Sequence, residues 1–221
     1  MVLRLKLSKQ GFKAIKVCFI FLFTVFVLGY FTPILCTALI LLLFRDEKRV
    51  ITDPDSCLPP CDGIVESIKK DIALDSVTEN EYKDKKWNKI EIKNGITDIH
   101  VCRSPIEGTV KHIYYNPGLS GEQNIFYKKR ESLIIVISGK TEIIIEHVSQ
   151  NSLQSVSCYV KTGDLLKIGQ KYANQNLGGY VNMYLPVEHE LDVLESQKLI
   201  SAETVVSKLE KLHNDFLKEI Q

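Results

Sequence analysis

An uncharged apolar run near the N-terminus is the feature that most constrains this chain. Residues 17–44 contain no charged side chain and read VCFIFLFTVFVLGYFTPILCTALILLLF. A helical membrane span needs about 20 apolar residues, so the run is longer than one span and shorter than two. Gly29 and Pro33 interrupt it near the middle, and proline disfavours helix for the residue before it. The run therefore predicts a membrane anchor built from two short helices.

Basic residues flank this apolar run on both sides. They are Arg4, Lys6, Lys9, Lys13 and Lys16 before it, and Arg45, Lys48 and Arg49 after it. Basic flanks favour the cytoplasmic side of a membrane, which predicts a re-entrant helical hairpin with both ends on the cytoplasmic side of the cell membrane. A single tilted helix with the C-terminal domain outside is the alternative. A signal peptide is disfavoured, because the run is too long and no small-residue cleavage site precedes residues 44–46.

After residue 50 the hydrophobic pattern changes to that of β-strands. Turn signals such as Asn94-Gly95 separate short β-branched or alternating runs, which are residues 63–68, 89–92, 108–115, 132–137, 141–147, 155–160 and 180–185. Many short strands at this spacing predict a mostly β fold, a barrel-sandwich-like domain with repeated hairpins over residues 50–205. Residues 1–49 are the anchor in this division. Apolar residues at helical spacing predict a short amphipathic C-terminal helix over residues 206–221.

Two internal similarities support the repeated hairpins. Residues 60–68 and 105–113 share the pattern P-x-[DE]-G-x-V-x-x-I, in which a turn glycine leads into a strand. Residues 160–170 resemble residues 193–203 more weakly, and they also resemble the hairpin of lipoyl- and biotinyl-type domains. Lys167 is the candidate carrier lysine, but it lies inside the pattern rather than in a tight turn. We therefore expect structural hairpins, with a lipoyl-like carrier or adaptor module on the membrane as an alternative.

Charge and cysteine content argue against two classes of function. The formal net charge is +1, and the basic residues form no stripe with aromatic residues, so we expect no nucleic-acid partner. Cys57 and Cys61 are four residues apart but lack a second close Cys or His pair, so we expect no metal site. Scattered thiols are typical of a reducing compartment.

Five segments, in order along the chain, resemble the short, prokaryotic type of phosphatidylserine decarboxylase. They are residues 43–46 (LFRD, family F-F-R-D-P), 58–65 (LPPCDGIV, family S-P-A-D-G-x-V), 98–108 (DIHVCRSPIEG, family D-V-H-V-N-R-S-P-x-x-G), 159–164 (YVKTGD) and 177–186 (LGGYVNMYLP, family F-G-S-R-V-D-L-Y-L-P). Their order and spacing agree with the family from the anchor to about residue 205.

The resemblance implies a self-made cofactor and a lipid substrate. In this family the serine of a Gly-Ser pair attacks the preceding glycine carbonyl, the chain is cleaved, and a pyruvoyl group remains at the new N-terminus. An aspartate and a histidine assist the serine. The pyruvoyl carbonyl forms a Schiff base with the amine of phosphatidylserine and acts as an electron sink while carbon dioxide leaves. The product is phosphatidylethanolamine.

Four residues of this sequence correspond to that machinery. Asp62 and His100 match the assisting aspartate and histidine, and Gly178 matches the glycine whose carbonyl is attacked. Gly179 stands where the family has the pyruvoyl-forming serine. A glycine has no Oγ to attack with and no Cβ to become the pyruvoyl methyl, so we expect that the pyruvoyl group is not formed here. Apart from the resemblance, Asp62 is an ordinary turn residue, His100 a core histidine and Gly178-Gly179 a hairpin turn.

Further departures from the family pattern are Pro59 for a serine, Cys102 for an asparagine, Asn182 for an aspartate, and residues 94–97 for F-M-S-P. They leave three hypotheses open: an active decarboxylase of phosphatidylethanolamine biosynthesis, a catalytically inactive lipid-binding or regulatory partner of an active paralogue, and the carrier or adaptor module. The partners we expect are membrane phospholipid, phosphatidylserine or phosphatidylethanolamine, and either a second copy of the chain or an active paralogue.

Overall fold

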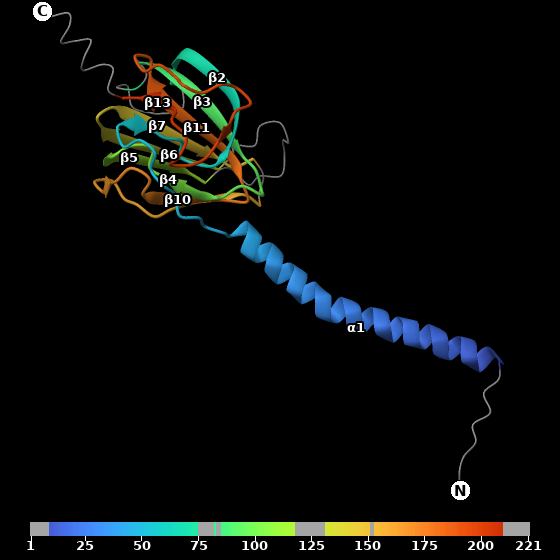
Figure 1. The fold of residues 1–221 in the computed structure, drawn as a ribbon. Helices are drawn as coiled ribbons and strands as arrows, with labels where there is room; N and C mark the ends of the chain where they lie inside the picture. The colour runs from blue at the N-terminus through green and yellow to red at the C-terminus, as the bar shows by residue number, and fades with distance from the viewer. Residues whose placement is uncertain (1–8, 75–81, 83–84, 118–130, 151–152, 210–221) are drawn as a thin grey trace, which may run out of the picture. The chain divides into compact units, whose positions relative to one another are not determined.

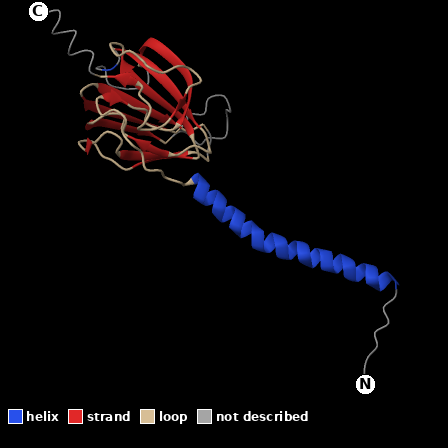
Figure 2. Cartoon of the chain, in the orientation of Figure 1, coloured by secondary structure: helices blue, strands red, loops and turns tan. Residues whose placement is uncertain are grey.

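The computed structural model describes residues 9–74, 82, 85–117, 131–150 and 153–209. The chain divides into two compact units, Met1–Phe44 and Arg45–Gln221. The first unit is helical and the second is built from β-strands (Figure 2).

The described part of the first unit is a single helix, α1 (Lys9–Leu43). The predicted helical hairpin is therefore wrong, because α1 continues through both Gly29 and Pro33 (Figure 1). Two threonines bond the helix backbone around these residues. Thr32 Oγ1 donates to the carbonyl of Leu28, and Thr37 Oγ1 donates to the carbonyl of Pro33 at 2.8 Å. Each hydroxyl adds a bond to a carbonyl four residues earlier, and neither bonds the Gly29 carbonyl, whose helical partner would be the N–H that Pro33 lacks.

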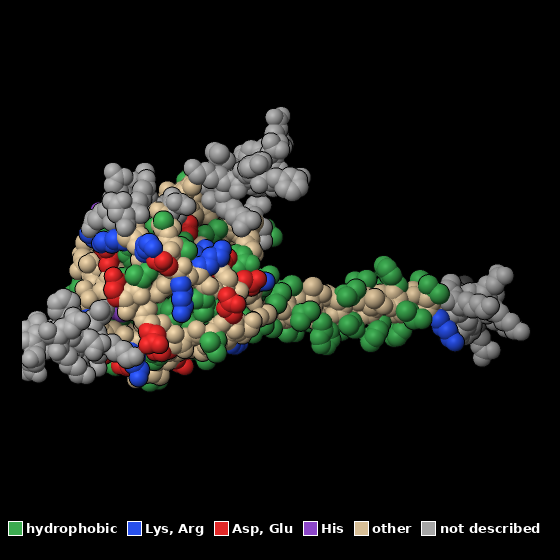
Figure 3. Space-filling view, turned by 90° about the horizontal axis from the view of Figure 1, so that it is seen from above, with side chains coloured by type: hydrophobic (Ala, Val, Ile, Leu, Met, Phe, Trp, Pro, Cys, Tyr) green, Lys and Arg blue, Asp and Glu red, His purple; other side chains and the backbone are tan. Residues whose placement is uncertain are grey.

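The apolar part of α1, Lys16–Leu43, is long and hydrophobic enough to cross a membrane. Its 28 residues correspond to about 42 Å at 1.5 Å per residue, whereas the hydrocarbon layer is about 30 Å thick. Hydrophobic side chains cover the visible length of this helix, while the visible β-rich surface mixes basic and acidic side chains (Figure 3).

The second unit contains three antiparallel sheets, which confirms the mostly β prediction (Figure 1). Its strands are β1 (Ser56–Cys57), β2 (Gly63–Ala73), β3 (Lys86–Asn94), β4 (Val101–Arg103), β5 (Gly108–Asn116), β6 (Ser132–Gly139), β7 (Glu142–Val148), β8 (Ser155–Cys158), β9 (Leu165–Leu166), β10 (Lys171–Asn176), β11 (Gly179–Pro186), β12 (Lys198–Leu199) and β13 (Ser207–Lys208). The main sheet has the order β12-β2-β3-β11-β7-β6-β5-β9. A smaller sheet has the order β4-β10-β8, and β1 pairs with β13.

The main sheet consists of two equivalent halves, β12-β2-β3-β11 and β9-β5-β6-β7. The repeated sequence pattern opens the equivalent strands β2 and β5, and in each the pairing shifts directly after the repeated valine, Val65 or Val110. Each strand begins at a glycine that lies against its neighbour. A Cβ on Gly63 would be 2.5 Å from the Lys93 carbonyl oxygen, and one on Gly108 would be 2.6 Å from that of Ser138. The predicted repeat is thus an approximate two-fold relation within the sheet.

The weaker repeat completes each half. Val110 exchanges two backbone hydrogen bonds with the Gly163-Asp164 turn, at 2.8 and 2.9 Å. Val65 makes the same two bonds with the Ser196-Gln197 turn, at 2.8 and 3.0 Å. Both turns use a positive φ, 94° at Gly163 and 64° at Ser196. The two segments therefore fold alike although few of their residues are the same.

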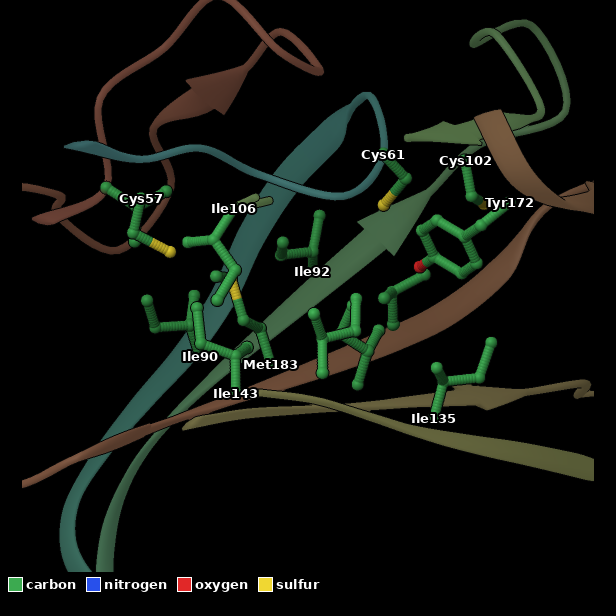
Figure 4. Packing of buried hydrophobic residues seen from close by; sticks show 14 of the residues in the cluster. Cys57, Cys61, Ile90, Ile92, Cys102, Ile106, Ile135, Ile143, Tyr172 and Met183 are labelled. Carbon is green, nitrogen blue, oxygen red and sulfur yellow. The ribbon is translucent and has the colours of Figure 1, made fainter. Parts of the chain in front are cut away.

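Apolar residues from the inner face of the main sheet form the larger core cluster. Ile90 and Ile92 of β3 pack there with Met183 of β11 and with Cys61 and Tyr172 (Figure 4). A second cluster covers part of the opposite face and comprises Leu74, Tyr82, Trp87, Ile134, Val136, Ile144 and Tyr184. The strands between the clusters, such as β6, are therefore apolar on both faces.

The predicted C-terminal helix is not present where it was expected to begin. Ser207–Lys208 form β13, which pairs with β1 through Cys57↔Ser207 and Ser56↔Lys208. Residues 210–221, the rest of that prediction, lie outside the described residues.

Candidate functional site

Asp62 lies in the loop that leads into β2 and is 8% exposed. Its Oδ2 accepts a hydrogen bond from Arg49 Nη2 at 2.6 Å, and its Oδ1 accepts one from the Ser201 backbone N–H at 2.8 Å. Burial raises the pKa of Asp62, an effect that the Ser201 N–H and the Arg49 guanidinium oppose and the Asp98 carboxylate reinforces. Asp62 is thus a buried, ion-paired carboxylate rather than an ordinary turn residue.

His100 directly precedes β4 and is 3% exposed. Its carbonyl accepts a hydrogen bond from the backbone N–H of Gln175 on β10 at 2.9 Å. The histidine is therefore held within the smaller sheet, against β10, the strand that leads to the Gly178-Gly179 pair.

Asn94, the last residue of β3, links the predicted site residues to one another. Its Nδ2 donates to the Asp62 carbonyl at 2.7 Å and to the carbonyl of Ile99, the neighbour of His100, at 3.2 Å. Asn94 also pairs with Gly179 in the β3–β11 register. The structure therefore brings the segments carrying Asp62, His100 and Gly179 together around one buried amide. Sequence reasoning noted residue 94 only as a departure from the family pattern, and its place before a turn glycine was the one available signal.

The Gly178-Gly179 pair forms the turn between β10 and β11. Leu177, Gly178 and Gly179 all have positive φ angles, 59°, 82° and 139°, and both glycines are buried. A Cβ on Gly178 would lie 2.4 Å from the Asn94 carbonyl oxygen. A Cβ on Gly179 would lie 2.2 Å from Gln175 Nε2 and 2.8 Å from the Val148 carbonyl oxygen. A Cβ at either position would therefore overlap a neighbouring group unless that group shifted, and the positive φ angles favour glycine.

A buried polar chain lies beside the glycine pair. His147 Nε2 is 2.8 Å from the Tyr172 hydroxyl, and its Nδ1 is 2.9 Å from Gln175 Oε1. Burial lowers the pKa of His147 to about 4, so its ring is neutral at physiological pH. Sequence reasoning found no partner for His147. The alternation of residues 142–148 places it on the inner face, but its two partners are more than 20 residues away in the sequence.

Two cysteines near Asp62 offer no substitute nucleophile. Cys61 and Cys102 are fully buried, and burial raises the thiol pKa of both, to about 12 for Cys102. A thiol that stays protonated is a poor nucleophile and a poor metal ligand. Within the part of the chain that the structure describes, no group of three His, Cys, Asp or Glu side chains is placed to hold a metal ion.

The residues at 178–179 do not fit the cofactor that the resemblance implies. A pyruvoyl group needs a β-carbon at position 179, and glycine has none. The space where that carbon would stand is taken by the Gln175 amide. Asp62 and His100 are both buried, and the roles that the resemblance implies for them stay predictions.

Comparison with known proteins identifies the family of the chain. The family model described as phosphatidylserine decarboxylase matches residues 36–207. A phosphatidylserine decarboxylase proenzyme of Wolbachia sp. subsp. Brugia malayi is 29% identical, over 93% of this chain and 92% of the relative. Proenzymes of the same name from Ehrlichia canis and Geobacter sp. (strain M21) are each 28% identical, over 93% and 82% of this chain and 92% and 84% of their own lengths. The chain belongs to the phosphatidylserine decarboxylase family.

Proposed function

We propose that this protein is a membrane-attached phosphatidylserine decarboxylase homologue that remains one uncleaved chain and does not itself decarboxylate lipid. The observation that carries the proposal is the glycine at position 179. Both the nucleophilic oxygen and the methyl carbon of a pyruvoyl group come from the side chain at this position. The closed geometry of the turn supports the proposal, because the Gln175 amide takes the space of that side chain.

The role we propose is that of a lipid-binding protein or a regulatory partner of an active paralogue. The ion pair between Asp62 and Arg49 is buried, and Asn94 joins the three site segments. The core of the family fold is thus kept although the nucleophile is absent. The ligand would be phosphatidylserine or phosphatidylethanolamine. The match over residues 36–207 favours this role over that of a lipoyl-like carrier.

Attachment to the cell membrane would be through α1. The continuous helix removes the argument for a cytoplasmic β-rich unit, because that argument required a hairpin with both basic flanks on one side. A single crossing places the two flanks on opposite sides, and more of the flanking basic residues precede the apolar run of residues 17–44 than follow it. The position of the β-rich unit on the cytoplasmic side is thus only a prediction. Protease protection of a C-terminally tagged chain in sealed vesicles tests it.

The test of the proposal is conversion of phosphatidylserine by the purified full-length chain in phospholipid nanodiscs. We expect no phosphatidylethanolamine above background, while an active family member prepared in the same way forms it. Native mass spectrometry on the same sample is expected to show retained phosphatidylserine or phosphatidylethanolamine in preference to phosphatidylcholine. Turnover by the chain alone would overturn the inactive assignment, and equal retention of all three lipids would overturn the lipid-binding role.

A further inference from the structure

Tyr172, His147 and Gln175 form a hydrogen-bonded chain in the middle of an apolar core. All three residues are 0% exposed. His147 stands on β7 and the other two on β10, so the chain connects the main sheet with the smaller one. Buried polar groups are costly unless they are fully bonded, so such a chain needs a structural reason. The two hydrogen bonds that join these three residues involve neither Asp62 nor His100.

The surrounding acceptors fix the direction of every bond in this chain. Gln175 Nε2 is 3.2 Å from the Tyr180 carbonyl oxygen and 3.5 Å from that of Val148. Two carbonyl oxygens require the amide nitrogen on that side, so Gln175 Oε1 must face His147 and accept its Nδ1–H. His147 Nε2 then accepts the Tyr172 hydroxyl proton. The neutral ring that this arrangement requires agrees with the lowered pKa of His147.

The end of the chain determines what position 179 can carry. The Gln175 amide nitrogen, fixed by these bonds, lies 2.2 Å from the place of a Cβ on Gly179. At Gly178 the obstacle is different, because a Cβ there meets the Asn94 backbone carbonyl at 2.4 Å. A side-chain obstacle can be removed by substitution, whereas a backbone obstacle cannot. The two neighbouring glycines therefore provide a matched pair for a test.

We propose that the Tyr172–His147–Gln175 chain is a positioning element that fills the side-chain space at position 179 and holds the Gly178-Gly179 turn in its left-handed conformation. This proposal deepens the proposed function and rests on it in one respect. The packing at position 179 fits glycine, so Gly179→Ser alone is expected not to restore self-cleavage. Gln175 acts directly on the turn, and His147 and Tyr172 act by orienting the Gln175 amide.

The experiment is a double-mutant cycle on the full-length chain, with unfolding of the β-rich unit as the readout. Gly179→Ala is expected to raise the unfolding equilibrium constant roughly ten- to a hundredfold, from steric overlap and a φ that alanine rarely adopts. In the Gln175→Ala background, the effect of Gly179→Ala is expected to be several-fold smaller than in the wild-type background, because the nearest obstacle has been removed. Recovery stays partial, since the Val148 carbonyl and the φ of 139° are unchanged. The control, Gly178→Ala, is expected to gain nothing from Gln175→Ala.

If Gly179→Ala does not fold, the readout becomes the yield of folded protein, which Gln175→Ala is expected to restore at position 179 and not at position 178. Equal effects of Gln175→Ala at both glycines, or no effect at either, would overturn the proposal. A nitrogen NMR spectrum of His147 in the wild-type chain adds a second test, with the Nδ1–H tautomer expected. The Nε2–H tautomer there would contradict the assigned bond directions.

The inference and the proposed function can fail separately. Intact mass of Gly179→Ser, alone and with Gln175→Ala, reports on cleavage without reference to stability. Cleavage of Gly179→Ser alone would overturn the positioning role and leave the wild-type assignment intact. Cleavage of the wild-type chain would overturn the proposed function, while the stability cycle would still report on Gln175.

Discussion

The loops that open the two halves of the main sheet share one backbone design and differ in their surroundings. Each contains a proline and an acidic residue directly before the glycine that starts the strand, yet Asp62 is buried and Glu107 is exposed. Asp62 contacts Arg49 and the Ser201 N–H, and Asn94 donates to its carbonyl. By the pairing of the two halves, the position equivalent to Asn94 is Gly139, which has no side chain. The repeated pattern of residues 60–68 and 105–113 therefore accounts for the backbone of the two loops. The residues that contact Asp62 lie outside this pattern.

A second difference lies on the strands at the centre of the sheet. Lys93 pairs with Tyr180 and Ser138 pairs with Glu142, so His147 on β7 corresponds to Leu185 on β11. Both residues are fully buried. One half thus carries a hydrogen-bonded histidine where the other carries an ordinary apolar residue. The polar position is the one that contacts Gln175 and, through it, the glycine turn.

The largest expected effect comes from removing the two acidic residues in turn. Asp62→Ala removes the nearest carboxylate, at 2.6 Å, from the Arg49 guanidinium, whose side chain is 9% exposed, and leaves only the longer contacts to Glu47 and Glu203 at 3.8 Å. Breaking a buried pair in this way costs about 3–5 kcal/mol of the free energy of unfolding. Glu107→Ala, at the exposed equivalent position, is expected to change it by less than about 0.5 kcal/mol. Chemical denaturation of both variants measures the difference, and equal losses would contradict the distinction between the two loops.

The next largest expected effect is a pH dependence of stability that comes from His147, a residue with no titratable equivalent in the other half of the main sheet. The pKa of His147 is about 4 in the folded chain, against an ordinary value of 6.5. The unfolded chain therefore takes up the proton first, so stability is full above pH 6.5 and falls as the pH drops from 6.5 to about 4. The loss amounts to roughly 3 kcal/mol. Thermal unfolding across this window is expected to show a steeper decline for the wild type than for His147→Gln.

The raised pKa of Asp62 acts in the opposite direction, since its carboxylate is easier to protonate in the folded state. For that reason the difference between wild type and His147→Gln is the quantity to measure. Identical slopes for the two proteins would show that His147 does not titrate as a buried neutral group.

A smaller effect tests the similarity of the halves. Gly63→Ala and Gly108→Ala each place a Cβ within 2.6 Å of a carbonyl oxygen on the neighbouring strand. We expect each to destabilise the β-rich unit by about 2 kcal/mol, as overpacking of a rigid site does. Denaturation midpoints that differ greatly between the two variants would show that the halves are less alike than their pairing indicates.

Much of the fold could be predicted because its signals are local. Turn glycines and β-branched runs mark the strands, and the repeated pattern at Gly63 and Gly108 indicates their equivalence. The helical hairpin was wrong because the prediction took Gly29 and Pro33 as the end of a helix, whereas α1 continues through both within one apolar segment. That correction also removes the basis for placing both chain ends on one side of the membrane.

The site could be predicted only in part. Asp62, His100 and the glycine pair were found through the resemblance to a family. Asn94 and the His147 network were missed, because their partners lie far away in the sequence, 32 residues from Asn94 to Asp62 and 28 from His147 to Gln175. No local pattern marks such contacts. They depend on which strand ends the fold brings together.

The most direct measurement of the central claim is the intact mass of the full-length chain purified from its membrane. The account predicts one species near 25.2 kDa with a peptide bond between Gly178 and Gly179. Two fragments separated between residues 178 and 179, the second with a blocked N-terminus, would contradict it.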